Sequence, residues 1–246
     1  MSEAIEIIAH RGYSAKAPEN TLASLEAAVA AGADTIEFDV HTAACGTPVL
    51  FHDSMLSRTT NGVGPVRRRT LEQLKALDAG KWFSPDFEGE RIPSFADALA
   101  ALKGRIPGIY AEVKGFRELE DLDRMVRITR DADMLDQVAF ISMNWTLLDR
   151  MRGQEEGLLI GYIVDEAGKA EEALQRATAD RCALVDFRAD LVTADPTLAQ
   201  RCRDLGIETA VWTVDDPAEA ARIAQLGIRR ITTNEVERLL AWRASR

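Results

Sequence analysis

The sequence predicts an α/β fold, a (β/α)8 TIM barrel with an insertion after the second strand. Short apolar runs of four to seven residues alternate with longer stretches in which apolar residues recur every three or four positions. Eight such strand and helix units fit into 246 residues, a length at which one barrel forms a single domain. An open doubly wound sheet is the alternative, because it has the same alternation of elements.

The apolar runs predict eight strands, at residues 5–10, 35–40, 109–114, 138–142, 159–164, 183–187, 208–214 and 230–234. Helices are predicted at residues 21–31, 119–132, 146–152, 169–178, 196–205, 217–226 and 235–243. Asn20 is a residue type that commonly caps a helix, so we expect it to be the N-cap of the first one.

Residues 41–107 are too many for a simple connection between two strands of a barrel. Their pattern predicts a hairpin, a helix near residues 70–78 and another near 94–103. No Gly-rich or Ser-rich linker interrupts the chain. We therefore expect a single TIM-barrel domain over residues 1–246, with a small insertion module at about 41–107.

The composition excludes some partners. A net charge of -10 argues against nucleic acid and anionic membranes, which bind basic surfaces, and a small-molecule anionic substrate is compatible with it if the binding site is locally positive. No apolar run reaches membrane-spanning length and the first residues lack a signal-peptide pattern, so we expect a cytoplasmic protein without a stable membrane anchor. Three distant cysteines, Cys45, Cys182 and Cys202, do not form a disulfide framework. The sequence leaves the oligomeric state open.

Acidic residues lie at the ends of the second and third predicted strands. Glu37 and Asp39 are two residues apart, so both side chains point to the same face, and Glu112 and Lys114 repeat this spacing. In a TIM barrel these strand ends form the active-site face. Three converging carboxylates repel one another unless a cation lies among them, and oxygen ligands suit Mg²⁺ or Ca²⁺. The alternative is that they pair with Arg11 or Lys114 and hold no metal.

Two histidines belong to the same predicted face. His10 ends the first strand, and His52 ends the run "PVLFHD" after a turn in which Gly46 supplies a positive φ. Two imidazoles can provide one general acid and one general base. A lone histidine on a short strand is more often a packing or surface residue, and the charged neighbours favour catalysis here. We expect His41 to lie in a loop or at the rim.

Several motifs occur in order between His10 and Lys114: "AHRG", "PENT", "GADTIEFDV", "GTPVLFHDSMLSRTTNG", "LDAGKWF", "IPSFADAL" and "YAEVK". Weaker matches, "FIS", "VWTV" and "ITTN", follow in the rest of the chain. This series resembles the glycerophosphodiester phosphodiesterase family.

The resemblance implies a metal-dependent hydrolase that converts glycerophosphodiesters to sn-glycerol 3-phosphate and an alcohol by acid/base catalysis. By the family pattern the catalytic pair is His10 and His52, the phosphate is bound by Arg11 and Lys114, and the Mg²⁺ or Ca²⁺ ligands are Glu37, Asp39 and Glu112. Phe51, Trp82 and Trp212 match aromatic residues of the glycerol pocket, and core packing is the other explanation for them. The sequence does not choose between water and the substrate's own glycerol hydroxyl as the nucleophile.

Two positions depart from the family pattern. Cys45 stands where the family usually has Asp before the glycine of the hairpin turn, a change that we expect to affect the turn little. At the end of the last strand the family usually has Asp or Asn, followed by an aromatic residue and Pro. Here only the Asn, at position 234, is present, which predicts a weaker rim contact there.

Two other functions are considered. One is a phosphodiesterase of lysophospholipase D type that acts on bulkier lysophospholipids. The other is a barrel that binds phosphodiesters without catalysis, and the presence of both histidines and all three acids argues against it.

Overall fold

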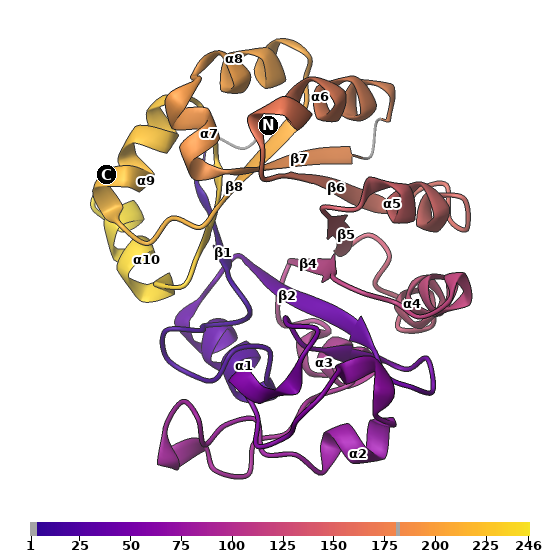
Figure 1. The fold of residues 1–246 in the computed structure, drawn as a ribbon. Coiled ribbons are helices and arrows are strands. Elements are labelled where there is room, and N and C mark those ends of the chain that lie inside the picture. Colours follow the sequence, from indigo (N-terminus) through magenta and orange to yellow (C-terminus); the bar gives the residue numbers. More distant parts are fainter. Residues whose placement is uncertain (1–3, 181–182) are drawn as a thin grey trace.

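Eight parallel strands form a closed barrel in the computed structural model, which describes residues 4–180 and 183–246 (Figure 1). The strands are β1 (Glu6–Ala9), β2 (Thr35–Thr42), β4 (Gly108–Val113), β5 (Val138–Ser142), β6 (Leu159–Val164), β7 (Ala183–Arg188), β8 (Glu208–Trp212) and β9 (Arg230–Thr233). Because β1 pairs with both β2 and β9, the ring closes. The predicted TIM barrel is confirmed, and the open-sheet alternative is wrong.

Helices surround this ring (Figure 1). They are α1 (Leu22–Ala31), α3 (Phe95–Leu102), α4 (Leu119–Asp131), α5 (Trp145–Arg152), α6 (Ala170–Ala179), α7 (Ala189–Ala194), α8 (Thr197–Asp204), α9 (Pro217–Gln225) and α10 (Val236–Ala244). Most lie within one or two residues of the predicted ranges, and the short α7 was not predicted. In the part of the chain that is described, none of the helices has the length and apolar character needed to cross a membrane.

Side chains of β2 alternate between the two faces of the barrel wall. Ile36, Phe38 and Val40 belong to the apolar cluster between the wall and the helices, and the ring of Phe38 packs 6.0 Å from that of Phe95 on α3. A strand has a side-chain period of two, so Glu37 and Asp39 face the interior. The outward apolar residues therefore fix the register that turns these two acids inward.

The interior of the barrel has its own apolar cluster below the acids. It consists of Ile8, Tyr110, Ala139, Ile141, Ile163, Leu184 and Ala210. The barrel is thus packed with side chains and is not an open pore.

Strand β2 continues beyond the predicted end at Val40. It forms an antiparallel hairpin with β3 (Pro48–Leu50), in which His41 pairs with Val49. The expectation of a loop at His41 is therefore wrong, because the hairpin extends the strand through it. A position at the rim stays a prediction. Gly46 has φ +74° in the turn, as predicted. Cys45 is exposed there, with its Sγ 3.3 Å from the Thr47 hydroxyl.

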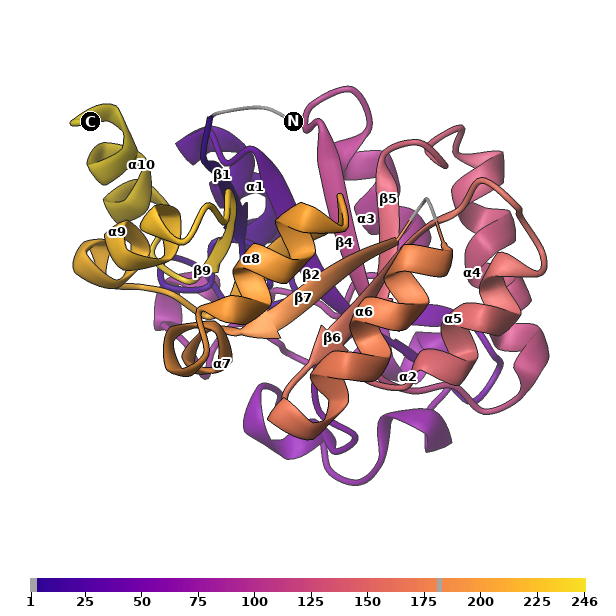
Figure 2. The ribbon, with the colours of Figure 1, turned by 90° about the horizontal axis from the view of Figure 1, so that it is seen from above.

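The rest of the insertion packs around a second, smaller apolar cluster. Its members are Ala43, Val49, Phe51, Leu56, Val66, Leu74, Ala79 and Ile92. The helix predicted near residues 70–78 is shorter, α2 (Leu71–Lys75). Figure 2 shows the insertion below the barrel, at the end opposite to that where the chain enters β1.

The cap of α1 differs from the prediction. Thr21 is the N-cap, and its hydroxyl accepts a hydrogen bond from the Ser24 amide at 3.3 Å. Asn20 precedes the cap in a left-handed conformation, φ +58°. Of the cysteines, Cys45 and Cys202 are free thiols, and Cys182 lies outside the described residues.

Gly12 allows the chain to turn tightly after β1. Its φ is +75°, its amide donates to the Glu37 carbonyl at 3.0 Å, and an added Cβ would lie 2.6 Å from the backbone carbon of Ser24. Gly104 has a similar φ of +72° but nothing within 4 Å of an added Cβ. Comparing Ala substitutions at these two glycines therefore separates the cost of a positive φ from the cost of a steric clash.

We predict that Gly12→Ala lowers the free energy of unfolding by at least about 3 kcal/mol and Gly104→Ala by only about 1 kcal/mol. Both substitutions place a side chain at positive φ, but only the first adds a clash with backbone. Urea denaturation measures the difference, and equal losses in the two variants would contradict the steric explanation.

Candidate metal and phosphate site

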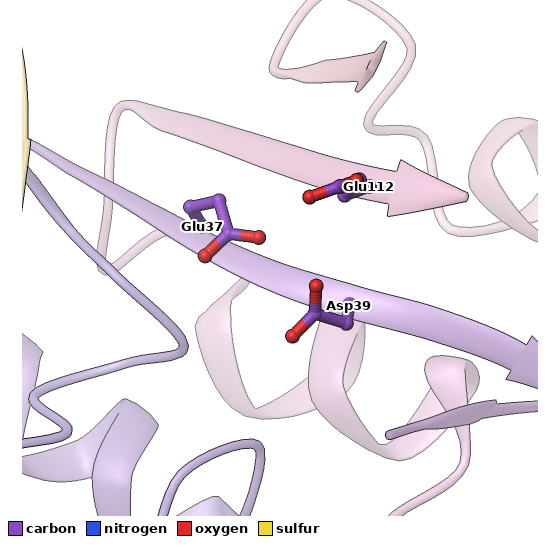
Figure 3. A group of neighbouring side chains, drawn as sticks. All are labelled: Glu37, Asp39 and Glu112. Carbon is purple, nitrogen blue, oxygen red and sulfur yellow. The ribbon is translucent and has the colours of Figure 1, made fainter. Parts of the chain in front are cut away.

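Three buried carboxylates gather inside the mouth of the barrel. Asp39 on β2 pairs directly with Glu112 on β4, and Glu37 lies one interior position earlier on β2. One oxygen from each of the three lies within 4.8 Å of the others, and all three residues are buried (Figure 3). The strand periodicity predicted this convergence.

Two cations approach the carboxylates from neighbouring strand ends. The Arg11 Nε lies 3.2 Å from Asp39 Oδ2. The Lys114 Nζ lies 2.7 Å from Glu112 Oε1 and 3.5 Å from Asp39 Oδ1. Pairing with basic residues, the alternative to a metal, therefore accounts for Asp39 and Glu112. Within the described residues the Glu37 carboxylate has no such contact with an arginine or lysine side chain, and its basic neighbour is the His10 Nε2 at 3.9 Å.

The two carboxylate oxygens of Glu37 differ in their hydrogen bonding. Its Oε2 accepts the Arg11 amide at 2.8 Å, whereas Oε1 is buried without a hydrogen-bond partner in the described part of the chain. Asp39 Oδ1 is likewise buried without a hydrogen bond. Buried carboxylate oxygens without a donor are destabilising, and oxygen ligands suit a hard divalent cation. The three carboxylates could thus hold a metal ion.

Burial and neighbouring charges shift the pKa values of the three acids in different directions. Burial raises the pKa of Glu37 well above its usual range, and the charges of Asp39 and Glu112 add to this. Burial, then the charge of Asp39, raises the pKa of Glu112 to about 7 although Lys114 opposes the shift. Burial alone would raise the pKa of Asp39, but Arg11 and Lys114 outweigh it and hold that pKa low. A bound cation would favour the ionised form of both glutamates.

Asn20 holds Asp39 in place. Its side-chain amide donates to Asp39 Oδ2 at 2.7 Å, and its Oδ1 accepts the Asp39 backbone amide at 3.0 Å. Asn20 is itself only 4% exposed, so its amide has no solvent to compete for these bonds. The residue expected to cap α1 instead orients a candidate metal ligand.

His10 lies between the carboxylates and the end of β9. Its Nδ1 is 2.8 Å from Asn234 Oδ1, and its Nε2 is 3.9 Å from Glu37 Oε2. Burial and then the charge of Arg11 lower the pKa of His10 to about 4, so the imidazole is neutral near pH 7. Asn234 follows β9, the eighth strand of the barrel, and contacts this histidine directly. From the sequence, the rim contact at this strand was expected to be weak.

His52 follows β3 and is oriented by charged neighbours. Its Nδ1 donates to Asp53 Oδ1 at 2.6 Å, and Arg58 donates to Asp53 Oδ2 at 2.6 Å. The hydrogen bond from Arg58 is the main cause that lowers the pKa of Asp53 to about 2. Arg58 also donates to Glu19 at 2.7 Å, and Glu19 accepts from Arg11 at 2.9 Å. A chain of ion pairs therefore links the two sides of the site.

Residues 10–238 match the glycerophosphoryl diester phosphodiesterase family. The chain belongs to this family. A glycerophosphodiester phosphodiesterase from Caldanaerobacter subterraneus subsp. tengcongensis is 31% identical over 238 residues, which cover 95% of this chain and 96% of the relative. The sequence-based expectation of a phosphodiesterase of this family is thereby confirmed.

Solved structures agree with this family membership. A phosphodiesterase from Oleispira antarctica, in complex with the product sn-glycerol-3-phosphate, has a TM-score of 0.88 at 28% identity and covers 96% of both chains. A glycerophosphodiester phosphodiesterase from Agrobacterium tumefaciens has a TM-score of 0.84 at 27% identity, over 96% of this chain and 99% of that one.

The aromatic residues predicted for the glycerol pocket of this family differ in position. Trp212 ends β8, is half-buried beside the interior cluster and donates its indole N–H to the Asp186 carbonyl at 3.4 Å. Phe51 is only 4% exposed and lies in the apolar cluster of the insertion, as core packing requires. Trp82 is 42% exposed. A role in glycerol binding stays a prediction for all three.

Four side chains of the site were not predicted from the sequence to belong to it, and one of them, Asn20, was expected only to cap α1. Glu19 and Asn20 come from "PENT", and Asp53 and Arg58 come from "HDSMLSRTT". Both strings contributed to the family resemblance, and each contains polar residues beside buried ones. That composition was the available signal, but it did not show which partners the residues contact.

We predict that the metal-free protein loses stability between about pH 4.5 and pH 7 relative to a Glu112→Gln variant. Below the usual pKa of 4.5 the carboxyl is protonated in both the folded and unfolded states. As pH rises the unfolded chain loses its proton first, so the folded state, with its pKa of about 7, becomes relatively less stable. The expected change is on the order of 3 kcal/mol, at about 1.4 kcal/mol per pKa unit.

Urea denaturation in EDTA at several pH values measures this difference. Added Mg²⁺ or Ca²⁺ should reduce the pH dependence in the wild type, because the ion favours the ionised carboxylate. A constant difference between the two proteins across this range would show that Glu112 is not perturbed by burial.

Proposed function

We propose that this protein hydrolyses glycerophosphodiesters to sn-glycerol 3-phosphate and an alcohol, with a bound Mg²⁺ or Ca²⁺ ion and acid/base catalysis by His10 and His52. The observation that carries the proposal is the buried set of Glu37, Asp39 and Glu112. Family membership supports the substrate class, as does the sn-glycerol-3-phosphate bound to the Oleispira antarctica relative.

The cationic side chains suit a phosphodiester. Arg11 and Lys114 lie beside the carboxylates, so each can bind a phosphate oxygen while its acidic partner holds it in place. When bound, the divalent ion withdraws charge from a phosphate oxygen. Cations on neighbouring strand ends would then bind the substrate's phosphate in one orientation.

The two histidines can move the protons that hydrolysis requires. One imidazole accepts the proton of the attacking hydroxyl group, and the other protonates the departing alkoxide. His10 and His52 are each held by a hydrogen-bonding partner at Nδ1, Asn234 and Asp53 respectively, which leaves Nε2 for the substrate. Proton transfer through fixed rings contributes about 10²- to 10⁴-fold to catalysis.

A bulkier lysophospholipid substrate is not favoured. The relatives from Caldanaerobacter and Agrobacterium are named for glycerophosphodiesters, and they match nearly the whole chain. We therefore place the small diester first, and choline and acyl-chain substrates compared side by side would separate the two.

We predict that the protein releases glycerol 3-phosphate from glycerophosphocholine and that EDTA abolishes the turnover. Restoring Mg²⁺ or Ca²⁺ should recover the rate, because either ion suits three carboxylate ligands. An assay coupled to glycerol 3-phosphate dehydrogenase measures the release and identifies the more effective ion.

Glu37→Ala provides the control for the metal assignment. It should remove the metal-dependent rate and leave the circular dichroism spectrum unchanged, because Oε1 accepts no hydrogen bond in the described chain and the loss at Oε2 affects one amide, that of Arg11. Full activity of this variant would overturn the metal site, and turnover that EDTA does not affect would overturn metal dependence. No turnover of glycerophosphocholine with either ion would leave the chemistry of the site open and make the bulkier diesters the next substrates to test.

We predict that His52→Ala lowers kcat by about 10²- to 10⁴-fold, because the substitution removes the side chain that carries out one of the two proton transfers. Arg67→Ala is a suitable control, since this exposed arginine lies in the same insertion and its rate should stay unchanged. Steady-state kinetics on glycerophosphocholine compare the two. An unchanged rate in His52→Ala would move the acid/base role to another residue.

A further inference from the structure

Asn234, the hydrogen-bonding partner of His10, is itself held in place by Asp215. The side-chain amide nitrogen of Asn234 donates to Asp215 Oδ2 at 2.8 Å. Asp215 Oδ1 accepts two more bonds, from the Asn234 backbone amide at 2.7 Å and from the Thr233 hydroxyl at 2.8 Å. Asp215 is thus an acceptor in all three bonds.

This arrangement fixes which way the Asn234 amide points. A carboxylate only accepts, so the NH₂ group of Asn234 must face Asp215 and its carbonyl oxygen must face His10. The Ser14 hydroxyl donates to the same carbonyl oxygen at 2.9 Å, which is consistent with this orientation. Asn234 Oδ1 therefore offers only lone pairs to the imidazole.

The tautomer of His10 follows from that orientation. Two acceptors cannot form a hydrogen bond, so at 2.8 Å from Asn234 Oδ1 the Nδ1 of His10 must carry a proton. Its Nε2, the nitrogen on the side of Glu37, is then the one that can gain or lose a proton. A histidine whose proton is on the wrong nitrogen is a poor catalyst even in the correct position.

We propose that Asp215 and Asn234 are positioning residues that keep the proton of His10 on Nδ1, so that Nε2 exchanges the proton with the substrate. The catalytic consequence rests on the proposed function, whereas the tautomer is a property of the folded chain. The sequence separation between His10 and Asn234 is 224 residues, and closure of the barrel between β9 and β1 brings them together.

The direct test is the ¹⁵N spectrum of the imidazoles by long-range ¹H–¹⁵N correlation. The protein has three histidines, so the loss of one signal set in His10→Gln assigns His10. In the full-length wild type we expect the Nδ1–H tautomer, both with EDTA and with Mg²⁺. An Nε2–H tautomer in the wild type would overturn the proposal.

A single substitution should reverse the tautomer. In Asp215→Asn the new amide offers a donor in place of Oδ2, so the Asn234 amide is expected to turn and present its NH₂ group to His10. His10 Nδ1 then becomes the acceptor and the proton moves to Nε2. The double variant Asp215→Asn/Asn234→Asp restores an acceptor facing His10 and a donor behind it, and should restore the Nδ1–H form.

Kinetics should follow the tautomer. We expect kcat to fall by about 10²-fold or more in Asp215→Asn with KM changed less than about threefold, and to recover at least about tenfold in the double variant. Asp216→Asn is the matched control, because this neighbouring, exposed carboxylate caps α9 through the Ala218 amide at 3.0 Å. Its rate should match the wild type.

The outcomes separate the two proposals. Loss of rate in Asp215→Asn with an unchanged tautomer, and no recovery in the double variant, would mean a general structural role and would overturn the positioning proposal. If the wild type hydrolyses no glycerophosphodiester, the proposed function fails, while the ¹⁵N spectra still decide whether Asp215 and Asn234 set the tautomer.

Discussion

Three carboxylates buried within 4.8 Å of one another are the constraint around which the rest of this site is built. Moving a carboxylate out of water costs several kcal/mol unless charges or hydrogen bonds compensate, and neighbouring negative charges increase that cost. The protein compensates from three directions, with Arg11 after β1, Lys114 after β4 and Asn20 before α1. In the described residues two of the carboxylate oxygens, Glu37 Oε1 and Asp39 Oδ1, accept no hydrogen bond, and such oxygens are suited to a divalent cation.

Both histidines are oriented by hydrogen-bonding partners that are not among the three carboxylates. His52 is held through Asp53 and Arg58 of the insertion, and His10 through Asn234, which follows β9. In both cases the partner occupies Nδ1. Two rings from different parts of the fold therefore present the same nitrogen, although one depends on a local loop and the other on closure of the barrel.

Much of this could be predicted from the sequence, because strand periodicity is local. The spacing of Glu37 and Asp39 set their common face, and the strand ends placed Glu112 beside them. Contacts between distant segments could not be predicted. Asn20 has the composition of an N-cap, but its partner Asp39 is reached only in the folded chain, and the cap function passes to Thr21.

Local rules also failed where two segments pair unexpectedly. His41 was placed outside the second strand because nothing before the turn indicates that the strand continues, and pairing with Val49 extends it. Phe51 matches a family position for a pocket residue, and a single sequence does not show whether such a ring packs inward. Phe51 is buried in the insertion by residues on both sides of it in the chain, from Ala43 to Ile92, which come together only on folding.

The length of β2 determines the effect that a register error during folding would have on the enzyme. One continuous strand carries Glu37 and Asp39 inside the barrel and then forms the hairpin that leads to His52, with the Phe51 amide bonded to the Asp39 carbonyl at 3.0 Å. A slip of one residue would turn both acids outward and displace the histidine in the same event. Misassembled molecules should therefore be inactive rather than partly active or altered in specificity.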